Sequence, residues 1–238
     1  MEDKIQQFKE LVNKCDNIVF FGGAGVSTES GIPDFRSKDG LYNQQYKYPP
    51  ETILSHTFFM NKTEEFFKFY KLKMNSLKYQ PNITHIKLSE LEARGKLKAV
   101  ITQNIDGLHQ KAGSKVVYEL HGSVLRNYCM NCNKFYDAEY VFNSNGIPRC
   151  SCGGIIKPDV VLYEEGLDEE TIENSTAAIQ KADLLIVAGT SLTVQPASGL
   201  INFFRGRNLV LINRDSTPYD NKANLVINDS LGKVFSNL

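Results

Sequence analysis

The stretch IVFFGGAG, residues 18–25, decides the fold class of this chain. A short apolar run typical of a buried strand passes there directly into a glycine-rich turn. Similar apolar runs recur at 97–102, 116–120, 182–189, 208–213 and 225–227, with helical patterns between them. Buried strands that alternate with helices predict an α/β fold, a doubly wound parallel sheet with helices on both faces.

Two insertions interrupt the predicted sheet. Residues 41–84 are rich in aromatic side chains at helical spacing, and residues 125–157 hold four of the five cysteines. We therefore expect a Rossmann-like nucleotide-binding domain made of three segments, 1–40, 85–124 and 158–238. A helical insertion and a zinc-ribbon insertion would together form a smaller second domain.

The charge balance limits the classes of partner. The 238 residues contain 27 Lys and Arg against 27 Asp and Glu, which gives a formal net charge of zero. This balance argues against a strongly cationic nucleic-acid binder. No apolar run approaches the ~20 residues of a membrane span, and the N-terminus lacks a signal-peptide core. We expect a cytoplasmic enzyme with no membrane association and no direct nucleic-acid binding.

The cysteine spacing predicts a metal site. Cys129 and Cys132 form one close pair, Cys150 and Cys152 another, with seventeen residues between the pairs. Four thiolates on two turns suit tetrahedral Zn²⁺, and a closed set of four leaves no open position for chemistry. The zinc is therefore interpreted as structural, with an iron–sulfur site as the alternative. The isolated Cys15 is interpreted as a buried helical thiol.

Two glycines after the first strand indicate a phosphate site. At Gly23 and Gly25 the backbone can turn tightly and bring its N–H groups close to a phosphate. The spacing departs from the dinucleotide fingerprint, because Thr28 stands where its last glycine or alanine would be. A plain tight turn is therefore an open alternative. Phe35 and Arg36 follow the turn and could equally be a core ring and a surface charge.

Polar residues follow the next two strands of the predicted sheet. The run TQNID, residues 102–106, brings amide and carboxylate groups to the carboxyl end of a strand, where α/β sheets bind ligands. An Asx turn or a helix cap explains the same run equally well. His121, followed by glycine, closes the following strand and is a candidate general base, although a lone histidine is more often structural.

Taken together, the blocks resemble the sirtuins, NAD-dependent protein-lysine deacylases. The similarity runs in order through GAGVSTESGIPDFRS, TQNIDGLH, ELHGS, the four cysteines, KPDVVLYEE, GTSLTVQP and INRD. It implies NAD as co-substrate, structural zinc and acylated-lysine proteins as substrates. The residues it assigns to NAD binding are Gly23, Ala24, Gly25, Thr28, Phe35, Arg36, Gln103, Asn104, Ile105, Asp106, His121, Gly189, Thr190, Ser191, Asn213, Arg214 and Asp229.

The resemblance also implies the chemistry. The acyl-lysine carbonyl oxygen would displace nicotinamide from the ribose, and the products would be lysine, nicotinamide and O-acyl-ADP-ribose. His121 would act as general base, with Asn104 and Asp106 as further catalytic residues. Val160 and its neighbours would pair with an extended substrate peptide by strand addition. Phe35 would shield the reacting ribose from water.

The chain departs from the family pattern at two places. Tyr163-Glu164-Glu165 replaces the usual Phe-Gly-Glu, which puts a charge beside the peptide groove. Desuccinylating members carry a Tyr-x-x-Arg pair, and the matching positions here are Phe67 and Tyr70, neither a cation. Neutral acyl groups, acetyl first, are therefore expected. Three alternatives remain open: a mono-ADP-ribosyltransferase at the same NAD site, a nicotinamide dehydrogenase and a non-catalytic zinc-ribbon adaptor.

Overall fold

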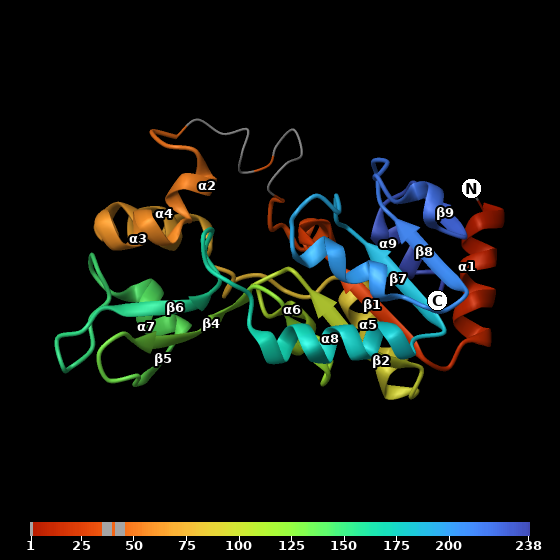
Figure 1. Cartoon of the computed structure of the whole chain (residues 1–238), viewed down its shortest axis with the longest axis horizontal. Coiled ribbons are helices and arrows are strands. Elements are labelled where there is room, and N and C mark those ends of the chain that lie inside the picture. Colours follow the sequence, from red (N-terminus) through yellow and green to blue (C-terminus); the bar gives the residue numbers. More distant parts are fainter. Residues whose placement is uncertain (1, 35–39, 41–45) are drawn as a thin grey trace.

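The structure is a computed structural model that describes residues 2–34, 40 and 46–238. Figure 1 shows an elongated molecule with a large sheet at one end and a smaller module at the other. The six strands of the large sheet lie in the order β3-β2-β1-β7-β8-β9, and every neighbouring pair is parallel. Their bounds are β1 Ile18–Gly22, β2 Leu97–Thr102, β3 Val117–Glu119, β7 Leu184–Ala188, β8 Asn208–Ile212 and β9 Leu225–Ile227.

Helices cover both faces of this sheet. Consecutive residues of β1 point to opposite faces, so Phe20 packs under α1, α5 and α9 while Phe21 packs on the α8 side. The α-helices of this part are α1 Glu2–Lys14, α5 Ile83–Ala93, α6 Leu108–Lys111, α8 Glu169–Lys181 and α9 Leu231–Phe235. Its 3-10 helices span Ala24–Val26, Thr28–Ser30, Ala197–Phe203 and Asp220–Lys222. The predicted doubly wound α/β fold is confirmed.

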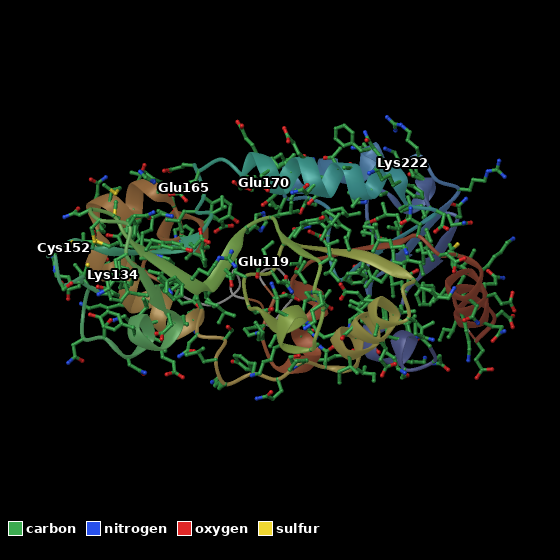
Figure 2. All side chains as sticks on the ribbon, turned by 90° about the horizontal axis from the view of Figure 1, so that it is seen from below. Glu119, Lys134, Cys152, Glu165, Glu170 and Lys222 are labelled. Atoms are coloured by element: carbon green, nitrogen blue, oxygen red, sulfur yellow. The ribbon has the colours of Figure 1, made fainter. Side chains whose placement is uncertain are left out.

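The smaller module has its own sheet and its own core. Its strands β4 (Gly122–Cys129), β5 (Phe135–Asp137) and β6 (Ile156–Val160) are antiparallel, in the order β5-β4-β6. The helices beside them are α2 Pro50–Ile53, α3 His56–Asn61, α4 Thr63–Lys73 and α7 Ala138–Asn143. Aromatic rings of α3 and α4 fill the core, with Phe59, Phe66 and Tyr70 almost fully buried. In Figure 2 the labelled Cys152 and Lys134 lie at the outer end of this module.

The strand order reverses at the middle of the large sheet. The chain leaves β1 toward β2 on one side, while β7 pairs with β1 on the other. Such a reversal opens a crevice at the carboxyl ends of the strands, where ligands of doubly wound sheets bind. No helix among the described residues is both long and apolar enough to cross a membrane.

Candidate functional site

A cavity of about 530 Å³ lies at the carboxyl edge of the large sheet, where the smaller module meets it. Residues that follow β1, β2, β7 and β8 line one side, and residues of α4 and of the segment after β6 line the other. Of the predicted site residues, those in the wall are Ala24, Gly25, Thr28, Gln103, Asn104, Ile105, Asp106, His121, Val160, Gly189, Thr190, Ser191, Asn213, Arg214 and Asp229. Gly23 is not among the residues that line the cavity, and Phe35 and Arg36 fall outside the described residues.

The glycine turn allows two strand ends to touch. The amide of Gly25 donates to the carbonyl of Gly189 at 2.8 Å, which joins the turn after β1 to the turn after β7. A Cβ on Gly25 would lie 2.7 Å from the Cα of Gly189, and Gly189 itself has a φ of +61°. Both positions therefore require glycine for this close approach. The turn is thus fixed at the point where the sheet reverses.

A chain of three polar side chains crosses the floor of the cavity. The amide nitrogen of Asn104 donates to the hydroxyl of Ser27 at 3.1 Å, and that hydroxyl donates to Asp106 Oδ2 at 2.6 Å. The other oxygen of Asp106 accepts from the backbone N–H of Leu108 at 2.9 Å. Burial raises the pKa of Asp106, against the lowering effect of the Ser27 and Leu108 hydrogen bonds. These bonds fix how Asn104 and Asp106 face the cavity.

His121 is held in one tautomer. Its Nδ1 lies 2.9 Å from the backbone carbonyl of Gln103, which can only accept, so Nδ1 carries the proton. Burial lowers the pKa of His121, partly offset by this hydrogen bond, so the imidazole is neutral near pH 7. In a neutral ring with a protonated Nδ1, Nε2 keeps its lone pair. His121 therefore presents a proton acceptor at the cavity wall.

A second chain of hydrogen bonds connects the strands on the other side of the crevice. Gln103 Nε2 donates to Thr190 Oγ1 at 3.2 Å, and the backbone N–H of Thr190 donates to Asn213 Oδ1 at 2.9 Å. The amide nitrogen of Asn213 is buried without a partner in the described part of the chain. A buried donor without a partner costs free energy unless a ligand accepts from it. This orphaned donor at the end of β8 fits the nucleotide end of a dinucleotide such as NAD.

The last two residues predicted to bind NAD, Arg214 and Asp229, differ in their surroundings. Arg214 is exposed beyond β8. Asp229 already has partners, because its carboxylate accepts from Lys233 Nζ at 2.6 Å and from the backbone N–H of Ser230 at 2.8 Å. Asp229 therefore offers less free hydrogen-bonding capacity than Asn213.

Sequence reasoning missed Ser27 as a site residue. The hydroxyl of Ser27 is 1% exposed and joins Asn104 to Asp106, residues that lie 77 and 79 positions away. The only local signal is that a small hydroxyl residue follows the glycine turn. Nothing in the sequence around it shows which side chains it meets.

Two segments line the cavity beside the histidine. One begins at Val160, the last residue of β6, and runs to Glu165, and the other follows β7 and includes Ser191, Val194 and Gln195. The backbone N–H of Val161 donates to the carbonyl of His121 at 3.0 Å, so the first segment is tied directly to the histidine. We call this first segment, residues 160–165, the β6 wall.

The predicted acyl end of the cavity contains a tyrosine. Tyr70 lines the cavity, fully buried, and its hydroxyl has no partner among the described residues, whereas Phe67 lies behind it in the core. Lys73 also lines the cavity, with its ammonium 5.5 Å from the ring centre of Tyr46. Lys71 points away and donates to Ser144 and Gly146.

The four clustered cysteines form one candidate metal site. Their Sγ atoms all lie within 4.8 Å of one another. The pairs Cys129–Cys152 and Cys132–Cys150 are 3.4 and 3.6 Å apart, too long for disulfides. Thiolates at these separations fit a tetrahedral Zn²⁺ ion, which would be fully coordinated and hence structural.

Known proteins resemble this chain over nearly its whole length. The sequence profile described as the Sir2 family matches residues 23–196. A protein of Clostridium perfringens named NAD-dependent protein deacetylase is 61% identical over 238 residues, covering 98% of each chain. A protein of the same name from Clostridium acetobutylicum is 62% identical over 236 residues, which cover 98% of this chain and 96% of that protein.

A solved structure gives the same result for the fold. A Sir2 protein described with a deacetylated p53 peptide and 3′-O-acetyl-ADP-ribose superposes with a TM-score of 0.90 and is 38% identical. The superposition covers 98% of this chain and 96% of that one. The similarity therefore includes both the large sheet and the smaller module.

Proposed function

This chain belongs to the Sir2 family and is an NAD-dependent protein deacetylase, and we propose that His121 is its general base. The observation that supports this role is the hydrogen bond from His121 Nδ1 to the Gln103 carbonyl. It leaves the Nε2 lone pair at the wall of the cavity, ready to accept a proton from a hydroxyl group of the bound nucleotide.

NAD is the co-substrate, and the residues that would hold it run along the carboxyl edge of the sheet. The N–H groups of Gly23 and Gly25 already donate to the carbonyls of Ala188 and Gly189, so within this turn the Ala24 N–H would face the pyrophosphate. Asn213 offers its unpartnered amide nitrogen to the adenosine end. Bound NAD would supply the ribose, which loses nicotinamide from one carbon and accepts the acetyl group on a hydroxyl oxygen, while the protein supplies binding, orientation and the base.

Asn104 and Asp106 would orient the reacting end of NAD. Both are held by Ser27, so their polar groups keep a fixed direction without NAD. Groups that need no reorganisation stabilise a transition state better than mobile ones. We place the nicotinamide and its ribose against this chain, with Ile105 beside them, and Phe35 and Arg36 keep their predicted roles at the ribose.

The substrate class is proteins acetylated on lysine. Solved Sir2 proteins are described with acetylated and deacetylated peptides. We infer that such a peptide lies extended between the β6 wall and the segment after β7, with Val160 among its contacts. Tyr70 and Phe67, both uncharged, favour an acyl group without charge, and acetyl is the smallest of these.

The remaining sequence predictions stay predictions. We propose that the chain divides into a Rossmann-like domain and a small domain, with the sheet of the small domain running from Gly122 to Val160. Zinc at the four cysteines would hold β4 and β6 together. A cytoplasmic location and the absence of direct nucleic-acid binding are further expectations.

Mass spectrometry of an acetyl-lysine peptide tests the proposal. With NAD present, the peptide should lose its acetyl mass while nicotinamide and O-acetyl-ADP-ribose appear in equal amounts. A succinyl-lysine peptide of the same sequence should react more slowly. Consumption of NAD with ADP-ribose added to protein, and no loss of acetyl, would contradict the proposal and indicate a transferase.

A further inference from the structure

Glu164 stands in the β6 wall with an unusual backbone conformation. Its φ is +77°, in the left-handed region that side chains other than glycine rarely adopt. Holding such a residue there costs of order 1 kcal/mol. A compensating contact is therefore expected at this position.

The compensating contact is made with the helical insertion. Glu164 Oε2 accepts from the backbone N–H of Thr57 at 2.9 Å, in the first turn of α3. Two further backbone bonds join the same segments, from Tyr163 N to Leu54 O and from His56 N to Tyr163 O, both at 3.0 Å. The carboxylate therefore has a fixed position beside the cavity. Its hydrogen bonds to Thr57 lower the pKa of Glu164, so it is ionised near pH 7.

The basic side chains near Glu164 have other partners. His56 Nδ1 lies 2.8 Å from Glu165, and Lys157 Nζ lies 3.1 Å from the same carboxyl group. Lys62 Nζ donates to the hydroxyl of Tyr48 at 2.6 Å. Glu165 is thus neutralised by its neighbours, whereas the hydrogen-bond partner of Glu164 is the uncharged Thr57.

The charge distribution around the groove is one-sided. Residues 164–170 contain five carboxylates and no cation, although Glu165 is paired with Lys157, and residues 191–195 after β7 contain no charged residue. Figure 2 shows Glu165 next to the smaller module and Glu170 at the start of α8, on the same side of the molecule. A substrate peptide would therefore meet a negative field from one wall only.

Glu164 also borders a second depression. It lines both the main cavity and a smaller hollow of about 240 Å³ formed by Thr52, Ser55, Thr57, Phe58, Asn61 and Lys62. A residue that flanks the acyl-lysine can extend from the groove past Glu164 toward this hollow. The charged groups that line this hollow are Glu164 and Lys62, and the Lys62 ammonium donates to Tyr48.

We propose that Glu164 determines substrate preference, favouring lysine or arginine and disfavouring aspartate or glutamate at a position next to the acyl-lysine. This inference rests on the proposed deacetylase function. Because the carboxylate is exposed to solvent, we expect an effect of about two- to fivefold in kcat/KM for each change of charge. Salt should weaken it, since exposed charges are screened.

Matched acetyl-lysine peptides test the proposal. Peptides of one length carry lysine, alanine or glutamate at a single flanking position, scanned along both sides, and kcat/KM is measured at low and high ionic strength. At one flanking position or more, kcat/KM should be highest for the lysine peptide, lower for the alanine peptide and lowest for the glutamate peptide. Equal rates for all three residues at every position would overturn the proposal.

Variants of Glu164 separate the effect of its charge on substrate preference from the effect of its backbone conformation. Glu164→Gln keeps an acceptor oxygen for Thr57 and should abolish the preference, and Glu164→Lys should reverse it. Glu164→Gly relieves the left-handed backbone and should also abolish it. Glu139→Gln, which removes an exposed carboxylate of α7 far from the cavity, should keep the order of the unmodified protein. An unchanged preference in Glu164→Gln would refute the role of the carboxylate.

The same assay distinguishes a failure of the charge preference from a failure of the proposed deacetylase function. Deacetylation of the alanine-flanked peptide establishes that the proposed function holds, whatever the charge preference. If no peptide loses its acetyl group while NAD is present, the proposed function fails and the preference fails with it.

Discussion

Two histidines follow neighbouring strands of the large sheet and differ in burial, in hydrogen bonding and in position. His121, after β3, bonds through Nδ1 to a carbonyl and lies at the cavity wall. His109, in α6 after β2, is 1% exposed, and neither of its ring nitrogens has a partner within residues 2–34, 40 and 46–238. Its ring lies 4.7 Å from that of His85, which is also buried.

The difference shows what makes a buried histidine suitable as a base. Burial lowers the pKa of all three rings, so each is neutral near pH 7. Only His121 combines this with a bond that fixes the tautomer and with a position at the cavity. His109 and His85 fill space under the sheet next to Phe20. We expect His121 to govern activity, and His109 and His85 to govern the stability of the fold in acid.

Removal of zinc should have the largest effect on activity. It should act through His121 and not through His109. β4 begins directly after His121 and ends at Cys129, so loss of the metal disturbs the strand that positions this histidine. Structural zinc contributes about 10–16 kcal/mol of binding free energy in small zinc domains. Chelation should abolish deacetylation, and added zinc should restore it. Full activity in a protein shown by metal analysis to lack zinc would contradict this expectation.

Replacement of the two histidines should separate chemistry from stability. His121→Ala removes the proposed base and should lower kcat by about 10²–10⁴-fold. Its thermal midpoint should change by less than about 5 °C, since one hydrogen bond is lost. His109→Leu, which loses no hydrogen bond, should keep kcat within about threefold. Steady-state kinetics and thermal unfolding of both variants test the pair, and a His121→Ala protein with nearly full activity would be inconsistent with the assignment.

Acid should destabilise the fold through the buried pair. Burial lowers the pKa of His85 to about 4 and holds that of His109 well below its ordinary value. The unfolded chain therefore binds more protons at mildly acidic pH, so stability is complete above about pH 6.5 and falls as the pH drops. His85 alone should account for about 3 kcal/mol by pH 4.

Urea unfolding at several pH values measures this loss. In His109→Leu one of the two titrating rings is absent, so the free energy of unfolding should fall less steeply below pH 6.5. Identical pH profiles for the two proteins would show that His109 does not titrate as described. His121→Ala serves as a second reference, because the partly exposed ring of His121 contributes less to the pH dependence of the free energy of unfolding.

The sequence predicted the fold well because its signals are local. The strand at 18–22 and the others of the large sheet are short apolar runs between turn residues, and the structure has a strand at each predicted place. The cysteine pairs likewise fix a metal site by spacing alone, since four thiolates must converge to bind one ion.

The sequence could not predict the contacts that join distant segments. Ser27 meets Asn104 and Asp106 only because β1 and β2 are neighbours in the sheet. Likewise, the bond from Glu164 to Thr57 links two segments 107 positions apart. The place of His121 at the end of a strand already favoured it over His109 as the candidate base, and the structure adds its hydrogen bond to the carbonyl of Gln103.

The smallest expected effect concerns Ser27, which connects the two catalytic side chains beside His121. Ser27→Ala removes the donor to Asp106 and the acceptor of Asn104, and should lower kcat/KM by about tenfold, as expected for one hydrogen bond to a charged group. Because the Ser27 hydroxyl lowers the pKa of Asp106, its loss should raise that pKa further. If activity needs ionised Asp106, the acidic limb of the pH–rate profile then moves to higher pH. Ser236→Ala, which removes an exposed hydroxyl near the C-terminus, should leave both kcat/KM and the profile unchanged. A tenfold loss without any shift of the acidic limb would mean that Ser27 acts by orienting Asn104 alone.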